Sequence, residues 1–492
     1  MNWLKRLFQK PAAPVARSLA DTIRFLRGRY DAALSTDNNR RHWAGADGYS
    51  VNTANNSDVR RLLRNRSRYE VANNSYAKGI VLTLANDVVG TGPRLQMLLE
   101  NPEANRRIES AFTQWARVIR LPEKLRTLRM ARAQDGEGFG MLINNPLLPF
   151  PLQLDLRLVE ADQVTTPDVV IDRTNIVDGI VFDEIENPIE YYVLTHHPGD
   201  LQSGLDQDYE RVPAELMIHY VRRDRPGQMR GIPDITPALP LFAMLRDYSL
   251  ATLDAAKAAA YFAGIIYTDA PPNGEADAVE PMDHIELERN MLLTMPGGWK
   301  LGQIRAEQPT GSYGEFKREI LNEIARCLNM PYNVAAANSS GYNYASGRLD
   351  HQTYFKSIRV EQAHLEAAVL DRLLMTWFEE VTRVPALLPG ELGRSLRKQR
   401  IAELSHQWFW DGHEHVDPAK EANAQATRLS SHTTTLADEY ARRGQDWETQ
   451  LRQRAKEKTL MTELGLDGPE SRGESPEQED EHADENQTAD AA

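Results

Sequence analysis

Residues 217–263 read MIHYVRRDRPGQMRGIPDITPALPLFAMLRDYSLATLDAAKAAAYFA, and this stretch decides the fold. Its first residues alternate apolar and polar side chains, which predicts a β-strand. A turn rich in proline, glycine and arginine follows, and we call residues 225–233 the elbow. The remainder is rich in alanine and predicts a helix of about seven turns. The stretch is typical of a structural part and not of a catalytic centre.

The length and composition are those of a large globular protein. With 492 residues, the chain exceeds the roughly 250–300 residues that one hydrophobic core supports, so several packed regions are expected. Cys327 is the single cysteine, which excludes an intrachain disulfide and fits a reducing compartment such as bacterial cytoplasm. The longest apolar stretch, residues 251–267, contains Asp254 and Lys257, so we expect no membrane span. The N-terminal segment has no continuous apolar core, so no signal peptide is predicted.

The net charge of −14 is unevenly distributed along the chain. Residues 1–70 carry 14 Arg and Lys against 6 Asp and Glu, whereas residues 468–492 carry 9 acidic residues and one arginine. Tight DNA binders are usually basic, because neutralising phosphates supplies most of the non-specific affinity. This chain is acidic overall, so we expect any contact with DNA to be weak.

The predicted fold class is α+β and mainly helical. Two helices separated by a short break are expected between residues 58 and 89, with an apolar stripe on one face and the arginines on the other. Residues 103–133 also predict helix. Apolar and polar residues alternate between turn signals in four later segments, which predict several strands at 135–144, 153–166, 176–197 and 215–223.

The C-terminal half is expected to return to helix. A strand-rich insert, residues 264–312, is bracketed by the alanine-rich helix and a second helix at residues 313–329. A polar loop, residues 332–347, leads into a helix from about residue 348 to 382 that lacks glycine and proline. Three short helices follow residue 417, one of them with a capping box made by Thr435 and Asp438.

Motifs for nucleotide binding or nucleophilic catalysis are weak in this sequence. No GxxxxGK[ST] occurs, so an ATP-driven motor is not indicated. Gly136, Gly138 and Gly140 form a GxGxG pattern, which we interpret as the entry turn of a strand because a preceding strand and a ribose-binding acid are not evident. Two SxxK patterns, at Ser75 and Ser395, lack any partner motif.

A dense group of possible metal ligands is formed by Asp411, His413, His415 and Asp417. On a strand their odd spacing would place them on one face. The group lacks cysteine and a second cluster, so we favour a solvated or interface loop over a metal site. A metal site here is the basis of an alternative hypothesis, a metal-dependent nucleic-acid enzyme.

The alanine-rich helix carries small side chains around most of its circumference, among them Ala251, Ala255, Ala259 and Ala263. Small residues let neighbouring helices approach closely, which favours packing in a ring of identical helices. The simpler explanation is helix propensity alone. The polar loop likewise permits two interpretations, an ordinary flexible connection or a surface whose neutral groups make replaceable contacts with DNA phosphates.

Four blocks of the sequence, between about residues 60 and 458, resemble the portal proteins of tailed bacteriophages in the lambda-like family. The blocks are RNRSRYEVANNSYAKGIVLTLANDVVGTG at 64–92; FDEIENPIEYYVL at 182–194 with IHYVRRDRPGQMRGIP at 218–233; LNMPYNVAAANSSGYNYASGR at 328–348; and DPAKEANAQATRL at 417–429 with RRGQDWETQLRQRAKEK at 442–458. Two departures leave details of turn shape and DNA contact open. Glu186-Asn187-Pro188 replaces a Gly-Arg-Pro turn, and Asn343 to Arg348 departs from an Asn-Tyr-Ser-Ser-x-Arg pattern.

The resemblance implies a portal fold that assembles as a ring. Its expected regions are a basic N-terminal arm, 1–45; a wing, 46–236; a first stem helix, 237–263; a clip, 264–312; a second stem helix, 313–331; a tunnel loop, 332–347; a long wing helix, 348–383; a helical crown, 384–466; and an acidic disordered tail, 467–492.

The resemblance also implies a function without chemistry or cofactors. A ring of twelve subunits at one capsid vertex would nucleate head assembly and conduct double-stranded DNA during packaging and ejection. Expected partners are the terminase large subunit, the head completion or head-tail connector protein, the major capsid and scaffold proteins, and weakly bound DNA, but no membrane. The protein would be found in the virion after assembly in the host bacterial cytoplasm. A capsid scaffold protein without a channel is the second alternative.

Three sets of residues are expected to carry this function. The tunnel-loop and channel set is Asn338, Ser339, Ser340, Asn343, Tyr344, Arg348 and Lys356. The stem-packing set is Ala251, Ala255, Ala259 and Ala263, and the elbow set is Arg225, Pro226, Gly227, Gln228, Arg230, Gly231 and Pro233. No catalytic or metal-binding residue is expected.

Overall fold

The computed structural model describes residues 37, 40–170, 174–200, 208–261, 265–268, 299–302, 312–388, 390–398, 405–412 and 418–466. The chain divides into two units, Met1–Ala54 and Asn55–Ala492. The first contains the four-residue helix α2 (Val51–Ala54), and all elements below belong to the second. Most of the predicted basic arm and the whole acidic tail lie outside the described residues.

The predicted helix pair near the start of the second unit is confirmed as α3 (Ser57–Asn73) and α4 (Ser75–Val89). Asparagine side chains cap both helices, because the Asn56 and Asn74 carboxamide oxygens accept bonds from the first free backbone N–H groups. The apolar side of α4 is buried in the main core, and Gly90 ends the helix.

The predicted orientation of α3 is right only in part, because Leu63 and Val71 pack in the main core whereas Leu62 and Tyr69 face solvent. Arg60 and Arg64 are buried, whereas Val59, Leu62 and Tyr69 are 38%, 49% and 56% exposed. The reason is electrostatic, since buried carboxylates from other elements lie beneath this helix and pair with its arginines. A stripe of apolar letters at helical spacing could not reveal those carboxylates.

The single helical region predicted at residues 103–133 is two helices, α5 (Pro102–Val118) and α6 (Leu121–Asp135). The chain breaks at Arg120, whose φ of 53° is left-handed, and Pro122 then lies in the first turn of α6. On α5, Phe112 and Trp115 pack against Trp377 in the main hydrophobic core.

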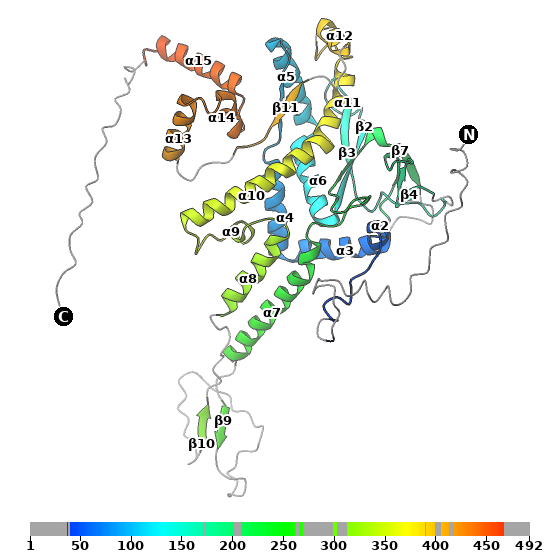
Figure 1. Cartoon of the computed structure of the whole chain (residues 1–492), viewed down its shortest axis with the longest axis vertical. Coiled ribbons are helices and arrows are strands. Elements are labelled where there is room, and N and C mark those ends of the chain that lie inside the picture. Colours follow the sequence, from blue (N-terminus) through cyan, green and yellow to red (C-terminus); the bar gives the residue numbers. More distant parts are fainter. Residues whose placement is uncertain are drawn as a thin grey trace, which may run out of the picture. The chain divides into compact units, whose positions relative to one another are not determined.

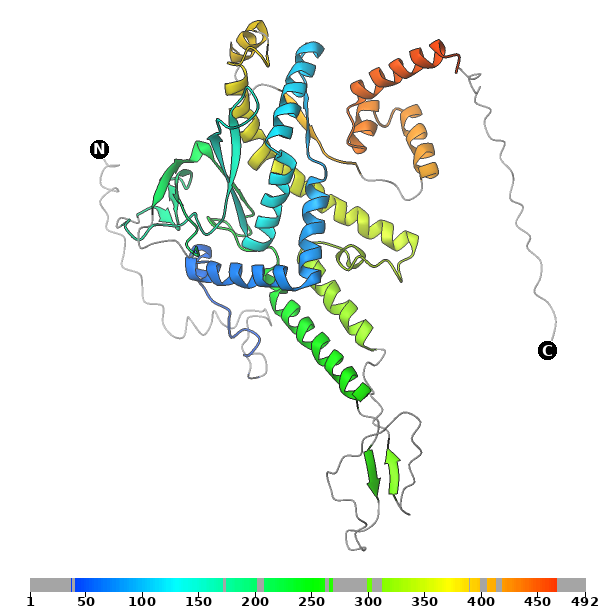
Figure 2. The ribbon, with the colours of Figure 1, turned by 180° about the vertical axis from the view of Figure 1, so that it is seen from behind.

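Two antiparallel sheets, of three and four strands, lie between α6 and the elbow in the described sequence. One has the order β3-β2-β8, built from β2 (Glu137–Asn144), β3 (Leu154–Val159) and β8 (Met217–Val221), and α6 packs along β2 and β3 (Figure 2). The other has the order β4-β5-β6-β7. Its strands are β4 (Ile176–Val177), β5 (Ile180–Phe182), β6 (Pro188–Leu194) and β7 (Tyr209–Pro213).

Three details of the sheets bear on the sequence patterns. Helix α6 ends at Gly136, whose φ is 92°, and β2 follows directly. The GxGxG pattern is therefore the strand entry that the sequence predicts. A dinucleotide site has the opposite order, with a strand before the glycines and a helix after them. Strand β7 was not predicted, because Val212 alone among its residues is buried and no alternation is visible.

Glu186 stands where the family pattern has glycine, and its φ is 66°. The Asp183 carboxylate stabilises this turn by accepting hydrogen bonds from the backbone N–H groups of Ile185 and Asn187.

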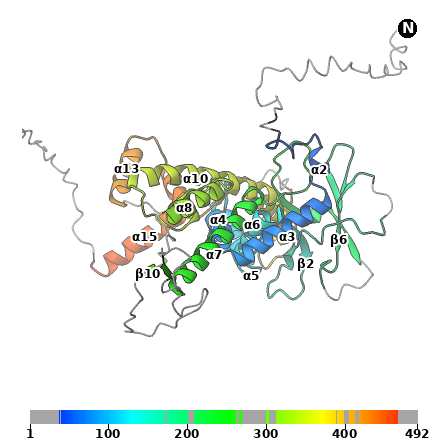
Figure 3. The same cartoon turned by 90° about the horizontal axis from the view of Figure 1, so that it is seen from below.

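Beyond the elbow, the short 3-10 turn η4 (Thr236–Ala238) leads into α7 (Leu239–Tyr261). Helix α7 contacts α8 (Ser312–Arg326), and the two helices form the stem-like pair seen in Figures 1 and 3. Between them in sequence, β9 (Ile265–Thr268) pairs with β10 (Trp299–Gly302) in antiparallel fashion. The other elements predicted for residues 264–312 lie outside the described residues.

The polar loop contains the one-turn helix α9 (Tyr332–Ala335), and the long helix starts earlier than predicted, as α10 (Tyr344–Leu365). Asn343 explains the earlier start, because its side-chain oxygen accepts from Ser346 N and caps the helix despite Gly347. A π-helical turn, Glu366–Leu370, joins α10 to α11 (Asp371–Val381).

After α11, the described elements are helical apart from the strand β11. Helix α12 (Gly390–Lys398) precedes β11 (His406–Phe409), which pairs with β1 (Arg94–Met97). The three predicted helices are confirmed as α13 (Pro418–Ser430), α14 (Leu436–Arg442) and α15 (Trp447–Glu463), and the capping box of Thr435 and Asp438 is present. No helix in the described part of the chain combines the length and apolarity that a membrane span needs.

Candidate functional site

The elbow is a turn organised around one buried glutamine. The Gln228 side-chain oxygen accepts bonds from the backbone N–H groups of Asp224 and Arg225 at 3.0 and 3.3 Å, and its NH₂ donates to the Arg230 carbonyl at 3.0 Å. Gly227 provides the left-handed backbone of the turn, with a φ of 73°. One side chain thus satisfies backbone groups on both sides of the turn, which fixes its shape.

Arg230 anchors the elbow in the protein interior. Its guanidinium is fully buried and lies 2.7 Å from the Glu137 carboxylate at the start of β2, and it also donates to the carbonyls of Val164 and Asp178. Glu137 in turn accepts from the His219 ring and from the Gly231 N–H, each at 3.0 Å. Burial opposes the charge on Glu137, but the Arg230 charge and the His219 hydrogen bond outweigh it, so the pKa of Glu137 lies well below its usual value.

A row of arginines on α3 extends this anchor. Arg60 pairs with Asp178, Arg64 lies 3.0 Å from Asp162, and Arg68 lies 2.6 Å from Asp135. The three arginines are four residues apart, so they share one face of the helix. The row ties α3 to the end of α6, to the loop after β3 and to the turn between β4 and β5, all of which surround the elbow.

A second buried network holds the end of the elbow where α7 begins. The Asp234 carboxylate lies 3.0 Å from Arg129 of α6 and 3.0 Å from Arg222. Arg132 of α6 bonds to the Glu361 carboxylate of α10 at 2.8 Å. The direction of α7 is therefore set by ion pairs that also reach α10.

The two stem-like helices contact each other through aromatic side chains but leave apolar surface uncovered. Tyr248 of α7 stacks on Tyr313 of α8 with ring centroids 5.7 Å apart. Met244, Leu250 and Leu253 of α7 are 67%, 54% and 51% exposed.

The stem-packing alanines are only partly described. Ala251 and Ala255 are exposed in the single chain. The Ala259 side chain and the whole of Ala263 lie outside what the structure describes.

The predicted channel residues fall on one loop and the helix after it. Within the loop, the Asn338 oxygen accepts from the N–H and hydroxyl of Ser340, at 2.9 and 2.6 Å, and the Asn343 oxygen caps α10. These two oxygens therefore shape the loop. Ser339, Arg348 and Lys356 are exposed, and the Tyr344 side chain lies outside the described residues.

The predicted metal group is not tested, because only Asp411 of its four residues is described. The Asp411 carboxylate accepts from the Thr91 N–H and hydroxyl at 2.5 and 2.7 Å, which joins the end of β11 to the turn after α4. His413, His415 and Asp417 lie outside the described residues.

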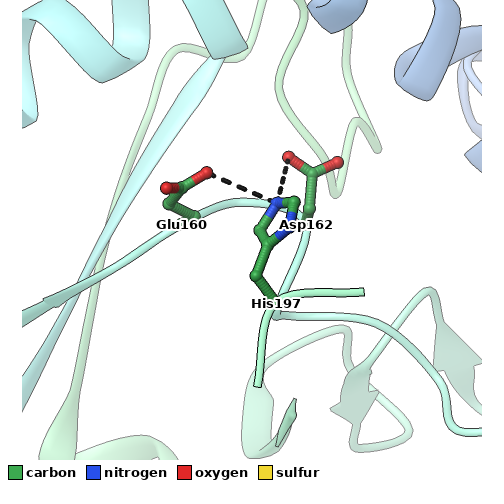
Figure 4. Close-up of side chains that lie close together, drawn as sticks. All are labelled: Glu160, Asp162 and His197. Atoms are coloured by element: carbon green, nitrogen blue, oxygen red, sulfur yellow. Dashed lines mark ion pairs between the residues drawn. The ribbon is translucent and has the colours of Figure 1, made fainter. Parts of the chain in front are cut away.

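A different acidic cluster, missed from the sequence, consists of Glu160, Asp162 and His197 (Figure 4). The His197 ring nitrogen lies 3.4 Å from the Glu160 carboxylate and 3.7 Å from that of Asp162. Arg64 and Arg68 approach Asp162 to 3.0 and 2.7 Å and already supply the positive charge that a metal ion would bring. We therefore assign the cluster to the ion-pair network of α3.

Comparison with known proteins gives the family. Residues 36–362 match the family described as phage portal protein, lambda family. The chain belongs to this portal family. It is 26% identical over 439 residues to a probable portal protein of Halomonas phage phiHAP-1, with 83% of this chain and 82% of that protein covered. It is 23% identical over 459 residues to portal protein B of Escherichia phage lambda, with 81% and 84% covered.

Similar solved structures come from particles of a gene transfer agent (GTA). A chain in the virion of the native particle has a TM-score of 0.42 at 15% identity, with 81% of this chain and 96% of that chain covered. A chain in the neck of the empty particle has a TM-score of 0.41 at 16% identity, with 74% and 87% covered. The family assignment is based on the sequence match. The ion pairs of the elbow are observed in the structure itself.

The close approach of the elbow to β2 can be tested with Gly231→Ala. A β-carbon at Gly231 would lie 2.2 Å from the Gly136 carbonyl oxygen, so backbone must move. We expect a loss of about 1–3 kcal/mol in the free energy of unfolding, measured by urea denaturation with tryptophan fluorescence. Gly314→Ala, in an open position on α8, is the control and should leave stability unchanged or slightly higher. Equal stability of both variants would contradict the close approach.

The buried pair Glu137–Arg230 predicts a pH-dependent effect of Glu137→Gln. At pH 7 the variant should lose about 3–5 kcal/mol of unfolding free energy, because Arg230 stays buried without its counter-charge. The folded pKa of Glu137 is lowered, so its contribution is complete above the usual value of 4.5 and is lost as the pH falls through the folded pKa. The difference from wild type should therefore shrink between pH 5 and pH 3.

Glu190→Gln is the matched control for this measurement. Glu190 pairs with the exposed Arg211, so its loss should cost within about 1 kcal/mol at any pH. A Glu137→Gln penalty that is small at pH 7, or the same at pH 3, would show that the buried pair is not the anchor.

Proposed function

We propose that this chain is the subunit of a ring at one capsid vertex, through which double-stranded DNA enters and leaves the head. The observation that carries the proposal is α7. Met244, Leu250 and Leu253 of this helix are exposed in the single chain although α8 packs beside it. Three large exposed apolar side chains on one helix indicate an interaction surface, so α7 needs neighbours beyond α8. Membership of the portal family makes further copies of the same chain the natural neighbours.

The elements can be assigned to the regions of such a ring. In this proposal the sheets and α3 to α6 form the wing, α7 and α8 the stem, and β9 with β10 the clip. The loop before α10 is the tunnel loop, α10 and α11 the long wing helix, and α12 to α15 the crown. The clip would face the terminase large subunit during packaging and the head completion or connector protein afterwards, while the wing would face the capsid and scaffold.

DNA contact in this ring is proposed to be weak and non-specific. The net charge of the chain is −14, and Asn338 and Asn343 use their side-chain oxygens within the loop. Of the predicted channel set, Ser339 on the loop and Arg348 and Lys356 on α10 are exposed and could contact phosphates. Few positive charges give little counterion release, which suits DNA that must slide.

Electron microscopy of the purified protein tests the proposal. We expect rings of about twelve subunits with a central hole wide enough for duplex DNA, assembled head to tail. A stable monomer that cleaves DNA in the presence of Mg²⁺ would instead support the alternative of a metal-dependent nucleic-acid enzyme. Closed shells without a channel would support a capsid scaffold.

Stem packing is tested by Ala255→Leu. The larger side chain should reduce the yield of rings or change their subunit number, because close helix approach depends on small residues. The unfolding free energy of the subunit should change by less than about 0.5 kcal/mol, since the position is exposed in the single chain. Ala422→Leu on α13 is the control at an exposed helical alanine outside the stem. Unchanged rings in Ala255→Leu would exclude close packing at this position.

A further inference from the structure

The two stem-like helices leave the main core at about the same level. Phe242 and Leu245 of α7 and Leu321 of α8 belong to that core and are at most 4% exposed. Further out, Leu250 of α7 and Phe316 of α8 are 54% and 46% exposed. Each helix therefore changes from embedded to exposed within little more than one turn.

Arg246 lies at this boundary on α7. Its Nη1 donates to both oxygens of the Glu70 carboxylate, at 2.7 and 2.9 Å. The guanidinium carbon of Arg246 also lies 5.5 Å from the centre of the Tyr69 ring, which is a cation–π distance. Because Tyr69 and Glu70 lie near the end of α3, one cation holds α7 to α3 where α7 leaves the core.

Lys317 lies at the corresponding boundary on α8. Its ammonium nitrogen is 5.0 Å from the centre of the Tyr76 ring, in the first turn of α4, and 5.8 Å from that of Tyr313. Lys317 precedes the buried Leu321 by four residues, so both share the side of α8 that faces the body. Tyr313 also stacks on Tyr248 of α7, which links this contact to the other stem-like helix.

Both contacts are made at the corner between α3 and α4. Asn74 forms this corner, because its side-chain oxygen caps α4 while its backbone N–H bonds to the last turn of α3. Figure 2 shows the stem-like pair leaving the body beside this corner. We call Tyr69, Arg246, Tyr76 and Lys317 the collar. In both contacts of the collar, the stem-like helix supplies the cation and the corner supplies the aromatic ring.

We propose that the collar holds the stem at a fixed angle to the body, and that this angle sets the number of subunits in the ring. The inference rests on the ring proposed above. The ion pairs of the elbow set the direction in which α7 starts, and Arg246 holds the helix about 10 Å further along. Leu250 and Leu253 lie beyond that point, so the contacts proposed for them with a neighbouring copy depend on the angle of the helix.

The link between angle and subunit number is geometric. In a closed ring, the rotation between neighbours is one full turn divided by the number of subunits. If the stem and the body of one subunit both contact the next, a fixed angle between them lets both contacts form at one rotation only. A loose stem lets both contacts form over a range of rotations, and rings of several sizes then close.

The double variant Tyr69→Leu with Tyr76→Leu tests the collar in the full chain. It removes both aromatic faces but keeps apolar side chains, so the share of rings with one subunit more or fewer than the commonest wild-type ring should rise at least about twofold. Electron microscopy and native mass spectrometry of the purified rings measure the sizes. Tyr69→Phe with Tyr76→Phe is the matched control, since it keeps both rings and should give the wild-type distribution.

Substitution of the cation gives an independent readout. Lys317→Met should also broaden the distribution of ring sizes, whereas Lys317→Arg should restore it, because a guanidinium also binds the face of an aromatic ring. Lys456→Met on α15 removes an exposed cation outside the collar and should change nothing. The thermal midpoint of each variant reports whether the subunit still folds.

The outcomes separate this inference from the proposed function. If the leucine double variant and Lys317→Met both fold and give the wild-type distribution of ring sizes, the collar does not set the subunit number and the ring stands. A phenylalanine double variant that broadens the distribution as much as the leucine one would also overturn the collar. If wild type forms no ring, the proposed function fails and this inference fails with it.

Discussion

The ion pair between Glu137 and Arg230 is the constraint on which the other parts of this fold depend. It joins the first residue of β2 to the elbow, and Arg230 also reaches carbonyls of the loop after β3 and the turn before β5. Gly231 can approach β2 so closely because Glu137 accepts its N–H. A buried pair of this kind is weak evidence for stability, but removal of one partner is costly, so the elbow has one permitted position. The direction of α7 follows from that position.

The sequence predicted the elements better than their contacts. The helix pair α3 and α4, the strand entry at Gly136, the elbow, the helices around the insert and the capping box on α14 all depend on local signals, and they could be placed. Arg60, Arg64 and Glu137 could not be placed, because their partners lie far away in the chain and no spacing rule relates them. The break at Arg120 and the strand β7 were missed because one depends on a left-handed residue and the other has a single buried side chain. Of the candidate site, the loop and the elbow were located, while the use of Asn338 and Asn343 inside the loop required coordinates.

The burial of several arginines explains an apparent contradiction between the composition of the chain and the weak DNA binding proposed for it. A chain that handles DNA would be expected to present its arginines to phosphate, and the first 70 residues contain many. Arg60, Arg64, Arg129, Arg132 and Arg230 are instead buried against carboxylates. They hold together the elements around the elbow, so they are not available to phosphate. In the conduit proposed above, each phosphate contact on the wall would slow the passage of DNA, so inward arginines suit that function.

The ion pairs of Arg60 and Arg64 on α3 are buried, so they respond to ionic strength differently from charges that face solvent. Salt screens charges that face water over a Debye length of about 8–10 Å at 0.10–0.15 M, but it screens buried pairs much less. Guanidinium groups keep their charge at every pH a cell reaches. In the proposed function, a change of ionic strength would therefore alter the attraction between exposed cations and DNA, while the buried ion pairs around the elbow would stay the same.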